Sequence, residues 1–175
     1  MSKNNMATKS ANLNKEKYKN ALLYFISECG NDHLGIMKLN KLFYYLDFIS
    51  YRDRKKSVTN ETYVHLPKGP LASVLLPNIV ELAKKESLIE HKEDASEKYG
   101  KRNRFRALKK ANLSVFDEYE KDLLQRICVE FKNWTTDELV AQTHTEAPWV
   151  FSRPSESLNY DNADDIELFS QKVSV

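Results

Sequence analysis

The chain has 175 residues, of which 41% are hydrophobic and 30% are charged, and its formal net charge is +2. This length suits a single domain with a sizeable core, and the apolar content is too high for a disordered chain. No apolar run approaches the roughly 20 residues that cross a bilayer, and the N-terminus lacks the apolar core of a signal peptide. We therefore expect a cytoplasmic protein that makes no use of a membrane.

The two cysteines, Cys29 and Cys128, lie far apart and lack the spacing of a zinc knuckle. Each falls on the expected buried face of a helix, where a thiol is unreactive. The sequence therefore predicts neither a disulfide framework nor a zinc site.

Charge is distributed unevenly along the chain. The first 20 residues carry net +4, residues 91–110 carry net +5 and residues 155–175 carry net −4. Such blocks are usually solvated faces and tails. The alternative is a basic surface in the middle of the chain that meets an acidic partner or nucleic acid. Composition alone does not decide between the two.

Apolar residues at three- and four-residue steps predict a first helix that Asn14 caps and Gly30 ends. A second helix is expected over about residues 34–52, and it carries two apolar stripes. The first stripe consists of Leu39, Leu42, Phe43, Leu46 and Ile49, and the second of Tyr44, Phe48 and Tyr51. A helix that is apolar on two faces is either central in the core or offers one face to a partner, and the core is favoured.

Residues 62–66 predict a short strand, and the two prolines around Gly69 predict a tight connection after it. Residues 71–86 carry a helical pattern with Pro77 inside it, where we expect a kink or a restart. Residues 88–93 and 104–108 predict the strands of a hairpin.

The last helices are expected to begin at Ser114 and at the capping-box pattern Thr135–Glu138. Beyond His144 the only regular signal is a docking turn formed by Ile166, Leu168 and Phe169. The order of elements predicts a mainly helical α+β fold, as a single compact domain with a small antiparallel sheet and a basic, winged-helix-like β-hairpin. The expected units are a flexible leader (1–13), the domain (14–152) and an acidic C-terminal tail (153–175).

Motifs for catalysis are scarce. No glycines are placed to cradle a phosphate, and no serine lies in a nucleophile elbow. His144 and Glu146 resemble half of a zinc deaminase signature, but the cysteines of that signature are missing. We therefore expect neither an enzyme nor a cofactor or metal. In the structural alternative, His144 and Glu146 brace backbone, Pro148 ends a helix and Trp149 packs into the core.

The order of helices and hairpin also permits a DNA-binding regulator, in which the basic hairpin would contact phosphates. Against this hypothesis, the helix expected over residues 71–86 offers only Asn78 to base edges. DNA binding is therefore possible but not favoured.

Residues 38–48 read KLNKLFYYLDF, and further blocks follow at residues 58–63, 66–70, 113–116, 134–139 and 143–149. In this order the blocks resemble the Panacea domain, the SocA-like antitoxin or phage-associated protein family. Asn60 stands where family members usually have glycine, and asparagine tolerates the same positive φ. The matching motif residues, for which a structural role is expected, are Lys38, Leu39, Lys41, Leu42, Tyr44, Asp47, Tyr63, Pro67, Gly69, Pro70, His144, Glu146, Pro148 and Trp149.

The resemblance implies a bacterial or prophage antitoxin of a type II toxin–antitoxin system, which binds a toxin protein encoded nearby. It also implies an alternative, an adaptor that delivers the toxin to a Clp protease. Because aromatic and arginine anchors dominate interfaces, we offer as a hypothesis that the toxin contacts Arg102, Arg104 and Arg106 and, if the second stripe is exposed, also Tyr44, Phe48 and Tyr51.

Overall fold

The computed structural model describes residues 13–30, 34–73, 75–96 and 100–170, so the expected leader, apart from Leu13, lies outside the described residues. The α-helices are α2 (Lys15–Glu28), α3 (Ile36–Arg54), α4 (Leu75–Lys85), α5 (Glu118–Phe131), α6 (Thr136–Thr143) and α7 (Ala147–Val150). Strands β1 (Tyr63–Leu66) and β2 (Gly69–Ala72) form one antiparallel pair, and β3 (Ile89–Ser96) and β4 (Gly100–Ala107) form another. Short 3-10 helices lie at η1 (Leu113–Val115) and η2 (Tyr160–Asp165). The expected mainly helical α+β fold is confirmed.

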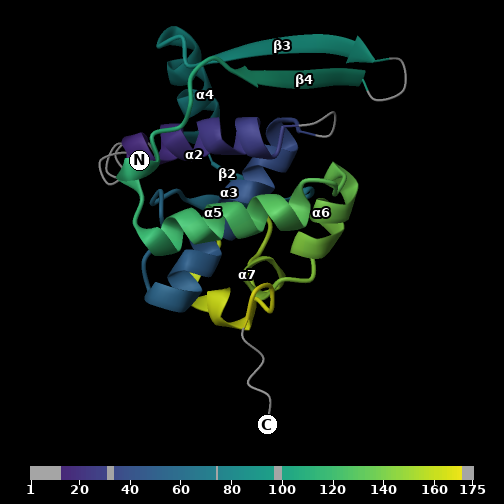
Figure 1. The fold of residues 1–175 in the computed structure, drawn as a ribbon. Helices are drawn as coiled ribbons and strands as arrows, with labels where there is room; N and C mark the ends of the chain where they lie inside the picture. The colour runs from purple at the N-terminus through teal and green to yellow at the C-terminus, as the bar shows by residue number, and fades with distance from the viewer. Residues whose placement is uncertain (1–12, 31–33, 74, 97–99, 171–175) are drawn as a thin grey trace, which may run out of the picture.

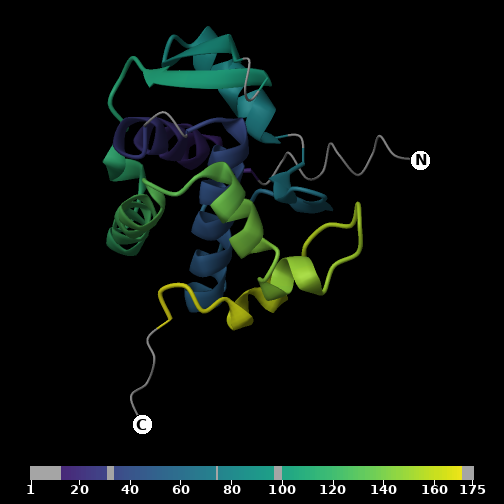
Figure 2. The same ribbon diagram turned by 90° about the vertical axis from the view of Figure 1, so that its right-hand side faces the viewer.

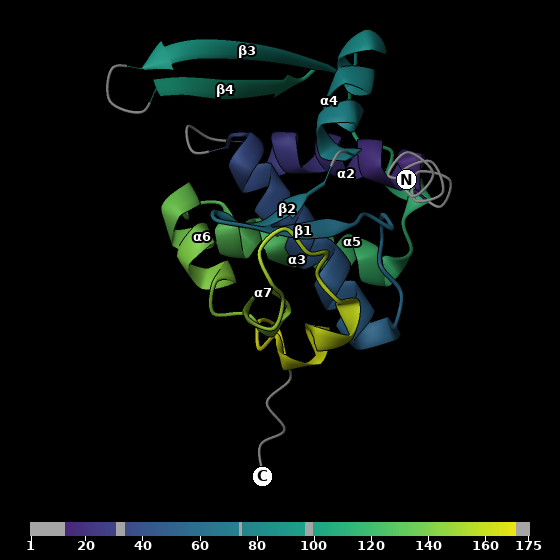
Figure 3. The ribbon, with the colours of Figure 1, turned by 180° about the vertical axis from the view of Figure 1, so that it is seen from behind.

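Helix α3 runs through the middle of the molecule (Figures 1 and 2). Helix α2 crosses above it, and α5 and α6 lie on one side. The β1–β2 pair lies on the other side, as Figure 3 shows. Every α3 residue from Lys38 to Ser50 is buried. The whole first stripe, together with Tyr44 and Phe48 of the second, therefore belongs to the core, which is the alternative that the sequence favoured, and the partly buried Tyr51 packs against that core.

Several helix starts follow the expected local chemistry. The Asn14 side chain accepts a hydrogen bond from the backbone N–H of Lys17, and Thr135 and Glu138 form a reciprocal capping box. Helix α5 begins later than expected, because residues 113–115 form η1 and Asp117 is itself the N-cap, in a second capping box. The described part of the chain contains no helix long and apolar enough to cross a bilayer.

The segment after Gly69 corrects the expectation for residues 71–86. Strand β2 extends to Ala72, and α4 begins only at Leu75. Pro77 consequently lies in the first turn of α4. An N–H group in the first turn has no acceptor within the helix, so a proline there costs no helical hydrogen bond. Gly69 has φ +85° and Asn60 has φ +62°, so both turns use the left-handed conformation that glycine and asparagine tolerate.

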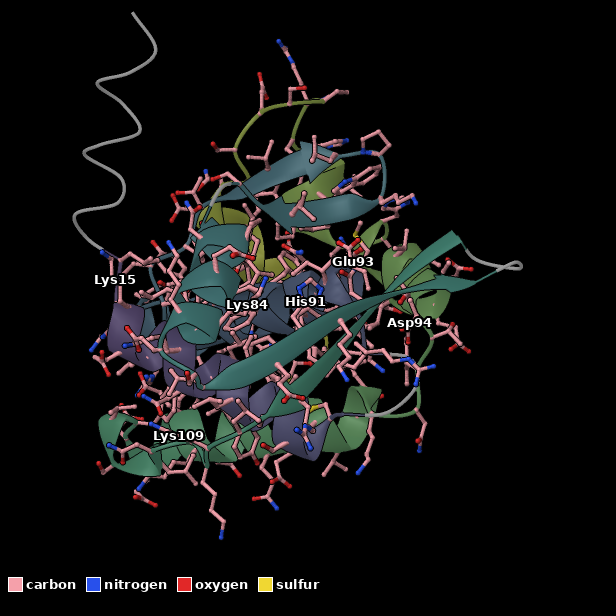
Figure 4. The ribbon with its side chains drawn as sticks, turned by 90° about the horizontal axis from the view of Figure 1, so that it is seen from above. Lys15, Lys84, His91, Glu93, Asp94 and Lys109 are labelled. Atoms are coloured by element: carbon pink, nitrogen blue, oxygen red, sulfur yellow. A yellow bond between two sulfur atoms is a disulfide. The ribbon has the colours of Figure 1, made fainter. Side chains whose placement is uncertain are left out.

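The β3–β4 hairpin lies across the top of the molecule, over α2 (Figures 1 and 4). Its strands are longer than expected, and they pair in register from Ile89 opposite Ala107 to Ser96 opposite Gly100. Ile89 is buried, and Phe105 and Ala107 pack against the core from the same face. The hairpin is thus anchored by one apolar face.

The cysteines correct another expectation. Cys29 and Cys128 form a disulfide whose Cα atoms are 5.3 Å apart, although 99 residues separate them in sequence. The end of α2 packs against the last turns of α5, and this packing brings two buried helix faces together. A pairing made by tertiary contact leaves no signature in the spacing of the two residues.

The C-terminal segment packs onto the C-terminal end of α3 (Figure 2). Ser157 forms an antiparallel bridge with Val64, and the Tyr160 ring stacks on Phe48 with ring centroids 4.2 Å apart. Ile166 is buried, and Leu168 and Phe169 pack against the core, as the docking turn expected there requires. The division into three units stays a prediction.

Candidate functional site

Asp47, in the middle of α3, holds the loop before β1. Its carboxylate accepts hydrogen bonds from the backbone N–H groups of Val58 (2.9 Å) and Thr59 (2.7 Å) and from the hydroxyls of Thr59 (2.6 Å) and Tyr63 (2.8 Å). Burial raises the pKa of Asp47 to about 6, although these four hydrogen bonds oppose the shift. This carboxylate is fully occupied by the chain's own donors.

Two lysines of the same motif are buried and bind backbone carbonyls. Lys38 Nζ donates to the carbonyl oxygens of Lys132 (3.0 Å) and Trp134 (2.6 Å), between α5 and α6. Lys41 Nζ donates to the carbonyl oxygen of Pro70 in β2 (2.6 Å). Burial lowers the pKa of Lys38 to about 8 and that of Lys41 to about 7. The motif thus fastens the loop before β1, the α5–α6 connection and strand β2 to one helix.

Gly69 lies where Lys41 and Thr143 meet. A Cβ atom at this position would lie 2.6 Å from Thr143 Oγ1, closer than real contacts allow, and 3.1 Å from Lys41 Nζ. Both the close approach and the positive φ require glycine here. The proline–glycine block and the block at residues 143–149 are therefore packed against each other.

Trp149 is stacked between two histidines, with its ring centroid 4.1 Å from those of both His65 and His144. Its indole N–H donates to the carbonyl oxygen of Leu66 (3.4 Å). Trp149 is only partly buried, so the expectation that it packs into the core is wrong. Pro148 lies in the first turn of α7, where a proline fits, rather than ending α6.

Glu146 and His144 turn inward from the same block. Glu146 accepts hydrogen bonds from Tyr45 (3.3 Å) and Gln142 (3.1 Å), and burial raises its pKa. The pKa of His144 is lowered, first by burial and then by the positive charges of Lys41 and His65. His144 Nε2 is buried without a hydrogen-bond partner in the structure. Within the described residues, no group of three or more histidine, cysteine or acidic side chains could hold a metal ion.

The proposed aromatic contacts on α3 are corrected by burial. Tyr44 and Phe48 are both 0% exposed, so neither can anchor a partner on the surface of this structure. Tyr51 is partly exposed, but its hydroxyl donates to Asp161 (3.0 Å) and its ring contacts Tyr160. The chain's own C-terminal segment therefore occupies the face that a partner was expected to use.

Two of the proposed arginine contacts on β4, Arg104 and Arg106, are on the surface. Arg104 and Arg106 have side chains 61% and 70% exposed, and they form ion pairs with Asp94 (2.8 Å) and Glu90 (2.8 Å) of β3. Arg102 lies in β4, opposite Asp94. The two described arginine side chains are thus already neutralised across the hairpin.

An exposed apolar tip follows Trp149, and the sequence did not predict it. Val150 is 51% exposed and Phe151 is 70% exposed, directly after α7. The only signal was a run of three large apolar residues where regular patterns end. Such a run does not predict which of its side chains are exposed, because it is too short to show a helical or strand periodicity.

The family described as "Antitoxin SocA-like, Panacea domain" matches residues 39–150, well over half of the chain. The match begins inside α3 and ends at the last residue of α7. It therefore contains the buried motif apart from Lys38, the β1–β2 pair and the Trp149 stack, but not α2 or the C-terminal segment. Neither a curated protein nor a solved structure matches the chain.

Proposed function

Because this chain belongs to the SocA-like antitoxin family, whose Panacea domain covers residues 39–150, we propose that it neutralises a toxin protein by binding it directly, as in a type II toxin–antitoxin system. The match over that range is the observation that carries the proposal. The toxin would be encoded beside this chain, in a bacterial or prophage genome.

The chemistry of the motif residues supports binding rather than catalysis. Lys38, Lys41 and Asp47 are directed to backbone and hydroxyl groups of this chain. Groups committed in this way shape a rigid domain and present no free nucleophile or base to a substrate. A neutralising protein needs such a domain and a stable surface.

The test is growth of cells that express the adjacent open reading frame from an inducible promoter, with and without this chain. We expect growth arrest from the neighbour alone and rescue when the two are produced together. The two purified proteins should then co-elute from a sizing column. A toxic neighbour that this chain neither binds nor rescues would contradict the proposal.

The same samples separate neutralisation by binding from the adaptor alternative. If the chain delivers the toxin to a Clp protease, the toxin level should fall on rescue and recover in a protease-deficient strain. If it acts by binding alone, the level should stay constant. DNA binding has weaker support, since the described arginines of the hairpin are paired with carboxylates.

A further inference from the structure

The tip of α7 exposes apolar surface that the chain's own packing does not use. Among the described large hydrophobic residues, Phe151 and Val129 are the two that are more than two thirds exposed, at 70% and 76%. Val129 lies on α5 between Cys128 and Glu130, without an exposed apolar neighbour in the chain, whereas Phe151 has Val150 and the partly exposed Trp149 beside it. Neighbouring exposed aromatic residues are a feature of protein interfaces.

Phe151 is presented from an ordered loop. The backbone N–H of Phe151 donates to Ala147 (2.9 Å), and that of Arg153 donates to the Glu156 carboxylate (3.1 Å). Ser155 and Glu156 then exchange backbone hydrogen bonds with His65 of β1 (2.9 and 2.8 Å). A loop whose backbone is held in this way loses little conformational entropy when a partner covers it.

Two cations lie in the segments around this tip. Lys68 lies in the β1–β2 turn, two residues after Leu66, whose carbonyl the Trp149 indole binds, and Arg153 lies two residues after Phe151. Figure 2 shows the turn and the loop projecting on the same side of the molecule. Both side chains are exposed, and in the part of the chain that the structure describes neither has a carboxylate partner. They differ in this from Arg104 and Arg106.

We propose that the α7 tip, defined as Lys68, Val150, Phe151 and Arg153, is the surface that the toxin binds, with Phe151 entering an apolar pocket rimmed by carboxylates. Unpaired cations around an apolar anchor are complemented by acidic groups on the partner. A second copy of this chain fits less well, since a two-fold interface would place the same cations against each other. This inference rests on the proposed function.

The test measures binding of the protein from the adjacent open reading frame to variants of this chain by calorimetry. Phe151→Ala and Arg153→Glu should each weaken binding at least tenfold, with an unchanged melting temperature because both side chains are exposed. The matched controls Val129→Ala and Lys110→Glu should bind within twofold of the wild type. The effect of Arg153→Glu should shrink at high salt.

If the wild type binds the toxin and Phe151→Ala binds it with the same affinity, the inference is overturned and the proposed function stays intact. No binding or rescue by the wild type would overturn both. Sedimentation and anionic vesicles test the other occupants. A dimer, or vesicle binding, that Phe151→Ala abolishes while toxin binding persists would reassign the tip to self-association or to a lipid surface.

Discussion

At the level of single residues, the buried polar side chains of α3 act on the backbone of other segments. Lys38, Asn40, Lys41 and Asp47 each bind a peptide group or hydroxyl that a surrounding loop or strand would otherwise leave unsatisfied. A buried donor or acceptor without a partner costs more than the hydrogen bond itself contributes. These residues therefore specify which loops lie against the helix.

Asp47→Ala tests this role most directly, because one carboxylate serves four donors. We expect a loss of about 3 kcal/mol or more in the free energy of unfolding, since several buried donors lose their acceptor together. Urea denaturation measures the loss. As a control, Asp122→Ala removes an exposed carboxylate that pairs with Arg126 and should cost less than about 0.5 kcal/mol. Equal effects of the two variants would contradict the role assigned to Asp47.

Lys41 makes stability depend on pH. Burial lowers its pKa from 10.5 to about 7. Between these values the unfolded chain binds the proton that the folded chain releases, so the free energy of unfolding rises as pH increases through this window. Each unit of pKa difference contributes at most ~1.4 kcal/mol. Below the window both states are protonated, and the contribution is lost.

Urea denaturation at several pH values from about 7 to 10 should show this rise in the wild type and a shallower one in Lys41→Met. Some slope should remain, because burial also lowers the pKa of Lys38, to about 8. Lys110→Met, at an exposed position, should keep the wild-type slope. Equal slopes in the wild type and Lys41→Met would show that Lys41 keeps an ordinary pKa in the folded chain.

At the level of elements, the sequence predicted helix caps and turns, which depend on the chemistry of a few adjacent residues. Asn14 and the Thr135–Glu138 pair cap helices where expected, and Asn60 adopts the positive φ that its turn requires. Strand β2 was missed because it contains Pro70 and follows a turn of two residues, so its short apolar run resembled the start of the next helix.

The misplaced parts of the candidate site depend on contacts between distant segments. Nothing near Phe48 in the sequence indicates that Tyr160 covers it, so the second stripe of α3 could be assigned to a partner. Similarly, the pairing of Arg106 with Glu90 requires the hairpin register, which the charge count of the block does not contain. Periodicity gives the buried face of a helix but not the segment that buries it.

The disulfide is also a link between elements, and it joins α2 to α5 across 99 residues. Cys29→Ser should lower the free energy of unfolding of the oxidised protein by about 2–5 kcal/mol, because the unfolded chain regains the freedom of a long loop. Excess reductant should lower wild-type stability to nearly that of the variant. Alkylation of the unfolded protein without reductant should find no free thiol. Two alkylated cysteines, with stability insensitive to reductant, would contradict the link.

At the level of the whole molecule, α2 and the C-terminal segment lie outside the family match over residues 39–150 but contribute side chains to the same core. Helix α2 contributes Tyr18 and Phe25, whose rings contact Phe43 of α3. The C-terminal segment contributes Tyr160, which stacks on Phe48, and Arg52 of α3 donates to the carbonyl groups of Ile166 and Leu168. Residues 39–150 alone would leave both surfaces of α3 uncovered.

Tyr160→Ala should therefore destabilise the whole domain rather than only its C-terminal segment. The variant loses the stack on Phe48 and the hydrogen bond from the Tyr160 hydroxyl to the Glu61 carbonyl (2.7 Å). We expect a loss of about 3 kcal/mol in a single cooperative transition, because large aromatic truncations in cores cost ~3–5 kcal/mol. Tyr160→Phe keeps the stack and should cost only about 1 kcal/mol.

Fluorescence and far-ultraviolet circular dichroism, followed through the same urea titration, distinguish the two outcomes. If the segment is integral to the core, both signals shift together to lower urea in Tyr160→Ala, and Asp165→Ala at an exposed position of η2 shifts neither. If the segment is an independent appendage, the circular dichroism midpoint of Tyr160→Ala matches that of the wild type. In that case the face of α3 around Phe48 would be available to a partner whenever the segment detaches.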